Sequence, residues 1–275
     1  MIKRSVFQKG NISFNYLVSY CSGDSPWICL ILPFGLKVDI AQPFFETFAK
    51  RFNIITYECR LILAPPSRKV VQDELTVDNH AKDLLSLLKY KNINNAILVG
   101  YCSGAGIALA TENQSPQSFS HLILINGEYT LLDDPDCITQ YGMDISNLLP
   151  IAAMSEDKAQ FILSRLKLEN PDVPCGVNLP FSQAHYFHRY AINYLSYRSV
   201  EYKKLARAVS TPTLLVTGTK DLQTNVSSTE KIQSLILDSL IHIESDGDHY
   251  GLLRERSKTL AYLYDYLSME LTGVV

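Results

Sequence analysis

The sequence predicts an α/β protein with a mostly parallel sheet flanked by helices and a helical cap inserted near the middle of the chain. Apolar, strand-like runs alternate with amphipathic helical stretches through the first half of the 275 residues. The alternation stops near residue 130 and resumes near residue 211, and five prolines fall in that interval. Strands that recur between helices of about ten or more residues predict β-α-β units, in which neighbouring strands run parallel.

The expected core elements follow in order along the chain. Residues 11–20 alternate apolar and polar positions, as a half-buried strand does, whereas residues 27–33 form the continuous apolar run of a strand buried on both faces. Further strands are expected at 52–58, 96–101, 121–126, 211–218 and 240–245, and helices at 39–51, 78–90, 103–113, 228–238 and 251–267. The core is therefore expected at residues 1–129 and 206–275, with the cap at 130–205.

Charge and hydropathy exclude several classes of protein. The 25 Lys and Arg residues nearly balance the 28 Asp and Glu residues, and no basic run is present, which argues against a nucleic-acid partner. No apolar run approaches the roughly 18 residues of a membrane span. The first residues, MIKRSVFQKGNISF, lack the apolar segment of a secretion signal, so we expect a cytoplasmic protein.

The six cysteines are scattered, with no CxxC pair and no clustered spacing. This pattern indicates neither a zinc site nor a disulfide framework, and nothing else in the sequence calls for a metal or cofactor. Five of the cysteines are expected to be buried, small apolar side chains. Cys102 is the exception.

Cys102 lies at the junction of a predicted strand and a predicted helix, in the sequence LVGYCSGAGIALA of residues 98–110. A nucleophile at such a sharp turn needs small residues two positions before and after it, where strand and helix cross. Gly100 and Gly104 fill these positions around Cys102, whereas Ser103 is flanked by Tyr101 and Ala105. We therefore predict Cys102 as the nucleophile; the alternative is a glycine-rich crossover with a buried thiol.

A catalytic thiol needs a base, and the base needs a carboxylate to orient it. Asp221 follows the predicted strand 211–218, and His249 follows the next predicted strand. We predict these two residues as acid and base. Glu128, which follows the strand ending at residue 126, is the alternative acid.

Backbone N–H groups are expected to stabilise the negatively charged oxygen of the reaction intermediate. One donor is the residue after the nucleophile, Ser103. The second should come from the loop Phe34-Gly35-Leu36, where we favour Leu36 and keep Phe34 as a possibility. The same loop is equally consistent with an ordinary strand-to-helix turn that requires Gly35.

A substrate pocket is expected above these groups, with Phe34 and Tyr101 in its wall. In the cap, Tyr186, Tyr190, Tyr194 and Tyr197 recur at helical spacing on one face. Such a face would suit an apolar or aromatic acyl chain. The alternative is that these tyrosines only dock the cap on the sheet.

Four segments in this order, LILPFG, GYCSG, VTGTKD and GDHYG, resemble those of α/β-hydrolase-fold enzymes over nearly the whole chain. Two segments depart from the usual pattern. Phe34-Gly35 stands in place of His-Gly, and residues 57–60 (YECR) lack the glycines of the usual Asp-x-Arg-Gly segment.

The cysteine narrows the resemblance. The GYCSG segment is similar to that of dienelactone hydrolases and polyhydroxyalkanoate synthases, which carry a Cys–Asp–His triad. Size and layout resemble the thioesterase-like enzymes of polyketide and nonribosomal-peptide pathways, including Dieckmann-type cyclases. The resemblance implies an acyl-Cys102 intermediate formed from a thioester on CoA or a carrier protein and resolved by cyclisation, transfer or water. A lactone hydrolase and a non-catalytic binding scaffold are the alternatives.

Overall fold

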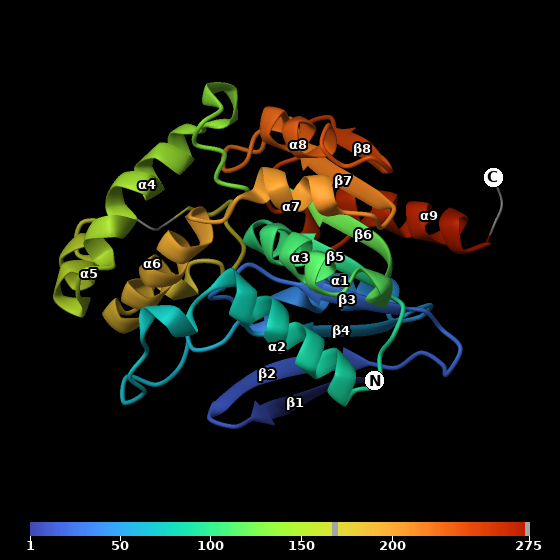
Figure 1. Cartoon of the computed structure of the whole chain (residues 1–275), viewed down its shortest axis with the longest axis horizontal. Helices are drawn as coiled ribbons and strands as arrows, with labels where there is room; N and C mark the ends of the chain where they lie inside the picture. Colours follow the sequence, from blue (N-terminus) through green and yellow to red (C-terminus); the bar gives the residue numbers. More distant parts are fainter. Residues whose placement is uncertain (167–169, 273–275) are drawn as a thin grey trace.

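One eight-stranded sheet forms the centre of the molecule (Figure 1). The structure, a computed structural model, describes residues 1–166 and 170–272. Along the sheet the strand order is β1-β2-β4-β3-β5-β6-β7-β8. The strands are β1 (Ile2–Lys9), β2 (Ile12–Ser19), β3 (Trp27–Ile31), β4 (Asn53–Tyr57), β5 (Ala96–Tyr101), β6 (Phe119–Ile125), β7 (Thr213–Gly218) and β8 (Ser239–Glu244).

The sheet is parallel from β4 to β8 and antiparallel at its β1 edge. β1 pairs with β2, and β2 with β4, in antiparallel register, whereas all later pairs are parallel. The sequence did not predict β1, because its residues are almost all exposed and its pattern IKRSVFQK carries three charges. The mostly parallel α/β sheet is confirmed.

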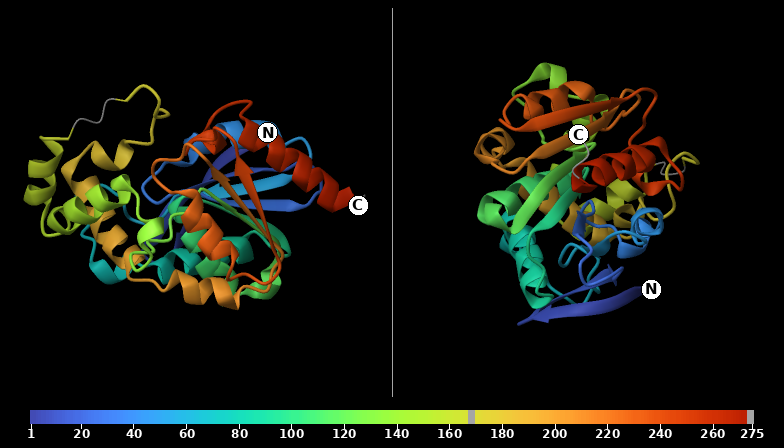
Figure 2. Two further views of the ribbon diagram at one scale, coloured as in Figure 1. Left: turned by 90° about the horizontal axis from the view of Figure 1, so that it is seen from above. Right: turned by 90° about the vertical axis from the view of Figure 1, so that its right-hand side faces the viewer.

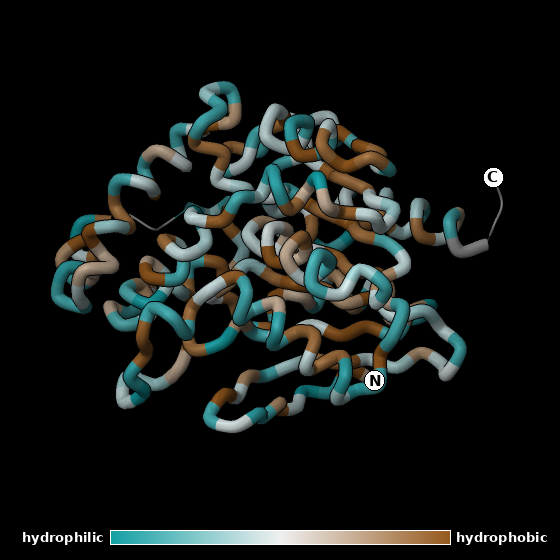
Figure 3. Tube along the Cα trace, in the orientation of Figure 1, coloured by the Kyte–Doolittle hydropathy of each residue, from teal (hydrophilic) through white to brown (hydrophobic). Residues whose placement is uncertain are grey.

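Helices cover both faces of the sheet (Figure 2). On one face, the side chains of α1 (Gln42–Phe48) and α9 (Lys258–Thr272) complete one apolar core with β3, β5, β6 and β7. On the other face lie α2 (Val77–Tyr90), α3 (Ser103–Gln114), α7 (Tyr202–Ala208) and α8 (Val226–Gln233). Coloured by hydropathy, the strands are mostly apolar and the outermost turns mostly polar (Figure 3).

The chain between β6 and β7 forms α4 (Gln140–Ala152), α5 (Glu156–Leu163), α6 (Ala184–Arg198) and α7. The first three gather to one side of the sheet, on the left in Figure 1. The expected cap boundary, residue 205, falls inside α7, which packs on α3 and α8 of the core. A buried hydrogen bond of 2.6 Å between His80 and Asn193 ties α6 to α2.

The predicted helix 251–267 begins later than expected. Residues Gly251–Leu253 form a single 3₁₀ turn, and α9 begins only at Lys258. Arg256 has a positive φ of 54°, which interrupts the helix, and the Ser257 hydroxyl then accepts a hydrogen bond of 3.1 Å from the N–H of Leu260. Ser257 is therefore the N-cap of α9.

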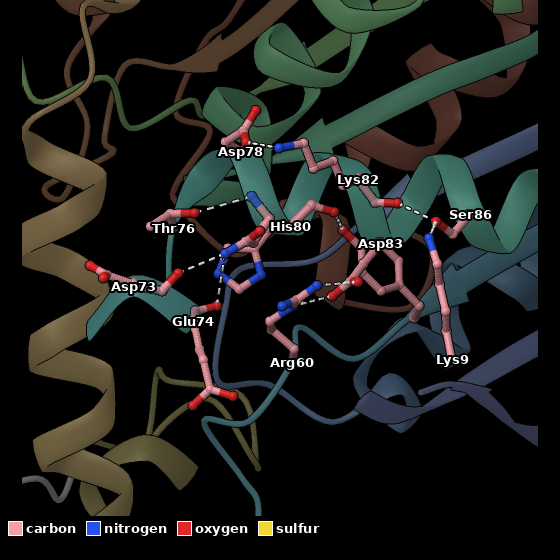
Figure 4. Close-up of polar contacts among 12 residues, drawn as sticks. Lys9, Arg60, Asp73, Glu74, Thr76, Asp78, His80, Lys82, Asp83 and Ser86 are labelled. Carbon is pink, nitrogen blue, oxygen red and sulfur yellow. Dashed lines mark hydrogen bonds and ion pairs between the residues drawn. The ribbon is translucent and has the colours of Figure 1, made fainter. Parts of the chain in front are cut away.

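The loop after β4, where the sequence departs from the usual glycine pattern, is held by an ion pair. Two guanidinium nitrogens of Arg60 donate to the two carboxylate oxygens of Asp83 on α2 (Figure 4). Asp83 is buried, so this bidentate pair is shielded from water. The loop also carries Ile62, which packs beside Gly35 near the predicted oxyanion loop.

Within the described residues, no helix is both long and apolar enough to span a lipid bilayer.

Replacing Gly100 by alanine should destabilise the protein. The added Cβ would lie 2.6 Å from the carbonyl oxygen of Gly104, and that atom is helix backbone that cannot move away freely. We expect the free energy of unfolding to fall by about 1–3 kcal/mol, measured by urea denaturation. Gly23→Ala is the matched control, because its Cβ would meet no atom within 4 Å. Equal losses in both variants would contradict the close-packing argument.

Candidate active site

Cys102 occupies a sharp turn between β5 and α3. Its backbone has φ 52° and ψ −123°, a conformation that a residue with a side chain rarely adopts. The turn is held on both sides: the Cys102 N–H donates to Ile125 O at 3.0 Å, and the Cys102 carbonyl accepts from Ala105 N at 3.0 Å. The structure therefore has the sharp strand–turn–helix at Cys102 that the glycine spacing predicted.

Asp221 and His249 lie together, as their spacing predicted. The His249 Nδ1 is 2.7 Å from the Asp221 Oδ2, and both residues are buried. The same carboxylate accepts hydrogen bonds from the backbone N–H groups of Gln223 and Thr224, at 2.8 and 2.9 Å, and from the Thr224 hydroxyl at 2.9 Å. These bonds fix the carboxylate, so that it can hold the histidine ring in one orientation.

Two side chains anchor the loop that carries His249. The Tyr101 hydroxyl donates to the His249 carbonyl at 2.8 Å. The Asn126 amide donates to the same carbonyl at 3.0 Å and to the carbonyl of Asp248 at 3.1 Å. Tyr101 lies in the pocket wall, as the sequence predicted. Asn126 was not predicted. A polar residue directly after the buried strand β6 was the available signal.

The pKa of His249 is raised to about 10. Burial alone lowers the pKa, but the Asp221 carboxylate, its hydrogen bond, and the neighbouring Cys102 sulfur outweigh this effect. A hydrogen bond between Cys102 and His249 contributes to the rise. The surroundings of His249 therefore favour a proton on the imidazole.

The predicted oxyanion donors surround the thiol. Ser103, Leu36 and Phe34 all line the pocket with Cys102. The Leu36 N–H makes a long hydrogen bond of 3.4 Å to Pro33 O, and the Phe34 N–H donates to the Ser103 hydroxyl at 3.3 Å. Both loop donors are therefore held by long bonds, which a developing oxyanion could replace at modest cost.

The pocket over Cys102 encloses about 570 Å³, measured out to its open mouth. Phe34 forms part of its wall and packs on Tyr190 with the ring centroids 5.1 Å apart. Tyr194 also lines it, as predicted. Further residues of the wall come from separate segments and were not predicted from the sequence: Pro33, Glu128, Tyr141, Val177, Pro180, Phe181, Gln223, Tyr250 and Leu253.

Tyr186 does not line this pocket, contrary to expectation. It lies one turn before Tyr190 on α6, about 6 Å further along the helix axis. There its ring packs against His185, with the centroids 4.2 Å apart. Tyr197 is buried and packs on Phe34 and Tyr202, so it docks the cap on the core.

Glu128, the alternative acid, does not pair with His249 in place of Asp221. It lines the pocket instead, and its backbone N–H donates to the Cys102 carbonyl at 3.1 Å. Burial raises the pKa of its carboxyl to about 7, although His249 and a hydrogen bond from Tyr194 lower it and Asp221 raises it further. The hydrogen bond that its side chain accepts from the Tyr194 hydroxyl is long, at 3.4 Å.

The other cysteines are less uniform than expected. Cys29 and Cys59 are buried, but Cys21 and Cys175 are exposed because both lie in loops outside the core. Across the two described ranges, no group of three or more His, Cys, Asp or Glu side chains could hold a metal ion.

Comparison with known proteins supports the fold and adds one functional lead. The chain is 28% identical to an L-allo-isoleucyltransferase of Pseudomonas savastanoi pv. glycinea over 231 residues, which cover 82% of this chain and 81% of that protein. No protein-family model matches the chain.

Solved structures with the same fold are more distant in sequence. An esterase from Thermogutta terrifontis superposes with a TM-score of 0.71 at 17% identity, covering 97% of this chain and 98% of that one. A bromoperoxidase from Bacillus anthracis gives 0.73 at 14% identity, covering 98% and 99%. A hydrolase from Oleispira antarctica gives 0.74 at 13% identity, covering 92% and 94%. The chain therefore has the α/β-hydrolase fold.

The thiol of Cys102 should react with iodoacetamide faster than an ordinary thiol at pH 7. A free cysteine is only a few per cent thiolate there, so His249→Ala should slow alkylation about 10- to 30-fold. Peptide mass spectrometry resolves each cysteine.

Cys175 is the internal control for this measurement, because its exposed thiol lies outside the pocket. Its alkylation should not respond to His249→Ala. Equal rates at Cys102 and Cys175 in the wild type would contradict the proposed pairing of thiol and imidazole.

Neutralising Glu128 should stabilise the protein above pH 7. Between the ordinary carboxyl pKa of 4.5 and the folded-state value of about 7, the unfolded chain releases this proton while the folded chain keeps it. Stability therefore falls across this window, and Glu128→Gln removes that loss. Because the side chain is partly exposed to the pocket, we expect a gain of about 1–2 kcal/mol at pH 8 and almost none at pH 4.5.

Urea unfolding at the two pH values measures this difference. A gain of the same size at both would show that packing, and not charge, causes it.

Proposed function

We propose that this chain is an acyltransferase that carries an aminoacyl group on Cys102, taken from one thioester and passed to a second thiol. The observation that carries the proposal is the thiol on a strained elbow beside the buried His249–Asp221 pair. The similarity to an L-allo-isoleucyltransferase supports an aminoacyl group as the cargo. The fold alone would suit an esterase equally well.

The first half of the proposed reaction loads the enzyme. The proton that Cys102 gives up is held on His249, and the sulfur attacks the carbonyl carbon of the donor thioester. The backbone N–H groups of Ser103 and Leu36 stabilise the oxygen that becomes negative. When the tetrahedral intermediate collapses, the C–S bond to the donor breaks, and the departing sulfur receives the proton from His249.

The second half reverses these steps with another thiol. The acceptor thiol gives its proton to His249 and attacks the acyl-Cys102 carbonyl, so that a new thioester forms and the Cys102 sulfur regains the proton. Each half exchanges one thioester for another, so the reaction requires no other reactant. Thiols of similar basicity make both directions accessible, and this is the chemical advantage of cysteine over serine here.

The surroundings of the thiol are consistent with a donor on a long arm, such as the pantetheine of CoA or of a carrier protein. Beyond the pocket, a groove runs outward between the cap and the loops after β7 and β8. Pocket and groove share a wall, made of Tyr141, Val177, Phe181, Gln223, His249 and Tyr250. A thin arm lying along this wall would bring its thioester to Cys102.

Acyl loading is the direct test of this function. Incubation with the N-acetylcysteamine thioester of L-isoleucine should add one aminoacyl mass to the protein, as seen by intact-protein mass spectrometry. Cys102→Ala should abolish the adduct, whereas Cys175→Ala should retain it because that thiol is exposed outside the pocket. Asp221→Asn should slow loading about 10- to 1,000-fold, because the histidine loses its orienting carboxylate.

Free pantetheine should then discharge the loaded enzyme and yield aminoacyl-pantetheine. Release of the free amino acid at the same rate with and without pantetheine would instead indicate a hydrolase. A wild-type protein that forms no adduct with any acyl thioester would favour a non-catalytic scaffold.

A further inference from the structure

Inside the pocket that the described residues line, Glu128 is a carboxylate with no lysine or arginine as its partner. Among the described residues that line the pocket, it is the one acidic side chain, and no lysine or arginine joins it. The Tyr194 hydroxyl donates to it at 3.4 Å, and its charge also interacts with the buried imidazole of His249 and the carboxylate of Asp221. His249 is already paired with Asp221 at 2.7 Å.

The position of Glu128 is fixed closely against the nucleophile. Its backbone N–H bonds to the Cys102 carbonyl, and its own carbonyl accepts a hydrogen bond from the Tyr197 hydroxyl of the cap. The residue follows β6, the strand next to β5, which ends directly before Cys102. The backbone of Glu128 is therefore held by both the core and the cap, and its side chain lines the same pocket as Cys102.

We propose that Glu128 binds the α-ammonium group of an aminoacyl substrate while the acyl carbon is attached to Cys102. This inference rests on the proposed aminoacyl transfer and names the group that makes the cargo an amino acid. An α-ammonium is only two bonds from the acyl carbon, so its binding partner must lie beside the nucleophile, as Glu128 does. The rings of Tyr141, Tyr190 and Tyr194 in the same wall offer the cation further favourable contacts.

The uncompensated charge also agrees with a binding role. Burial works against the ionised form of Glu128, as its raised pKa shows, and a bound ammonium would restore that form. A cation therefore supplies the interaction that the protein's own side chains leave out. A carboxylate kept for structure alone would normally have a cationic partner or several short hydrogen bonds.

Selectivity between two matched acyl donors tests the proposal. One donor is the N-acetylcysteamine thioester of L-isoleucine, and the other is the thioester of 3-methylpentanoic acid, which has the same carbon skeleton without the amino group. The readout is the initial rate of Cys102 acylation. We expect the wild type to prefer the aminoacyl donor roughly 10- to 100-fold, and Glu128→Gln to remove most of that preference by slowing the aminoacyl donor.

Asp157→Asn is the matched control. It also removes one carboxylate, but that side chain is exposed on α5 and lines neither the pocket nor the groove. The preference should persist in this variant. If Glu128→Gln instead slows both donors equally, Glu128 has a structural role and the proposal is overturned. An aminoacyl preference that survives Glu128→Gln would likewise overturn it.

A binding measurement separates this proposal from the acyl transfer itself. Calorimetric titration of the Cys102→Ala protein with L-isoleucinamide and with 3-methylpentanamide requires no chemical step. Binding of the first alone, lost in Cys102→Ala/Glu128→Gln, would support the ammonium site even if no thioester loads the wild type. Loading of both thioesters at equal rates, with equal binding of both amides, would leave acyl transfer standing and overturn the ammonium site.

Discussion

The geometry of the site depends on one crowded backbone crossing, where β5 turns into α3 at Cys102. A Cβ at Gly104 would lie 2.2 Å from the Ile31 carbonyl oxygen, and one at Gly100 would overlap the backbone of α3. Strand and helix can therefore approach closely only because both residues are glycine. The close approach of β5 and α3 accompanies the positive φ of Cys102, a strained backbone conformation.

The partners of Cys102 are brought to it by the ends of neighbouring strands. Asp221 follows β7 and His249 follows β8, and parallel strands deliver both loops to the same edge of the sheet. The core strands also hold the histidine loop directly, since Tyr101 of β5 and Asn126 beyond β6 bond to its backbone carbonyls. The loop that carries His249 is thus positioned by β5, β6 and β8. The imidazole itself bonds to the carboxylate of Asp221.

The sequence predicts the positions of residues best where the local pattern and the topology of the fold agree. The Gly100–Cys102–Gly104 spacing demanded an elbow, and chain order gave Asp221 and His249. The prediction for Tyr186 was wrong because a contact with the pocket also depends on position along the helix. Tyr186 shares a helical face with Tyr190 but lies one turn beyond the pocket. Helical periodicity specifies direction around the axis and says nothing about how far a pocket extends along it. The exposed edge strand β1 was missed for a related reason, because few of its residues are buried.

The role that we infer for Glu128 changes once its neighbours in the structure are known. In sequence it follows a core strand, where an acid could orient the histidine. In the structure, the Asp221 carboxylate bonds to His249 and accepts three further hydrogen bonds. His249 therefore needs no second acid as a partner. A largely buried carboxylate that does not pair with His249 still costs folding free energy at neutral pH. Retaining it in the pocket of Cys102, in a wall of tyrosines, is physically reasonable if the substrate brings the missing positive charge.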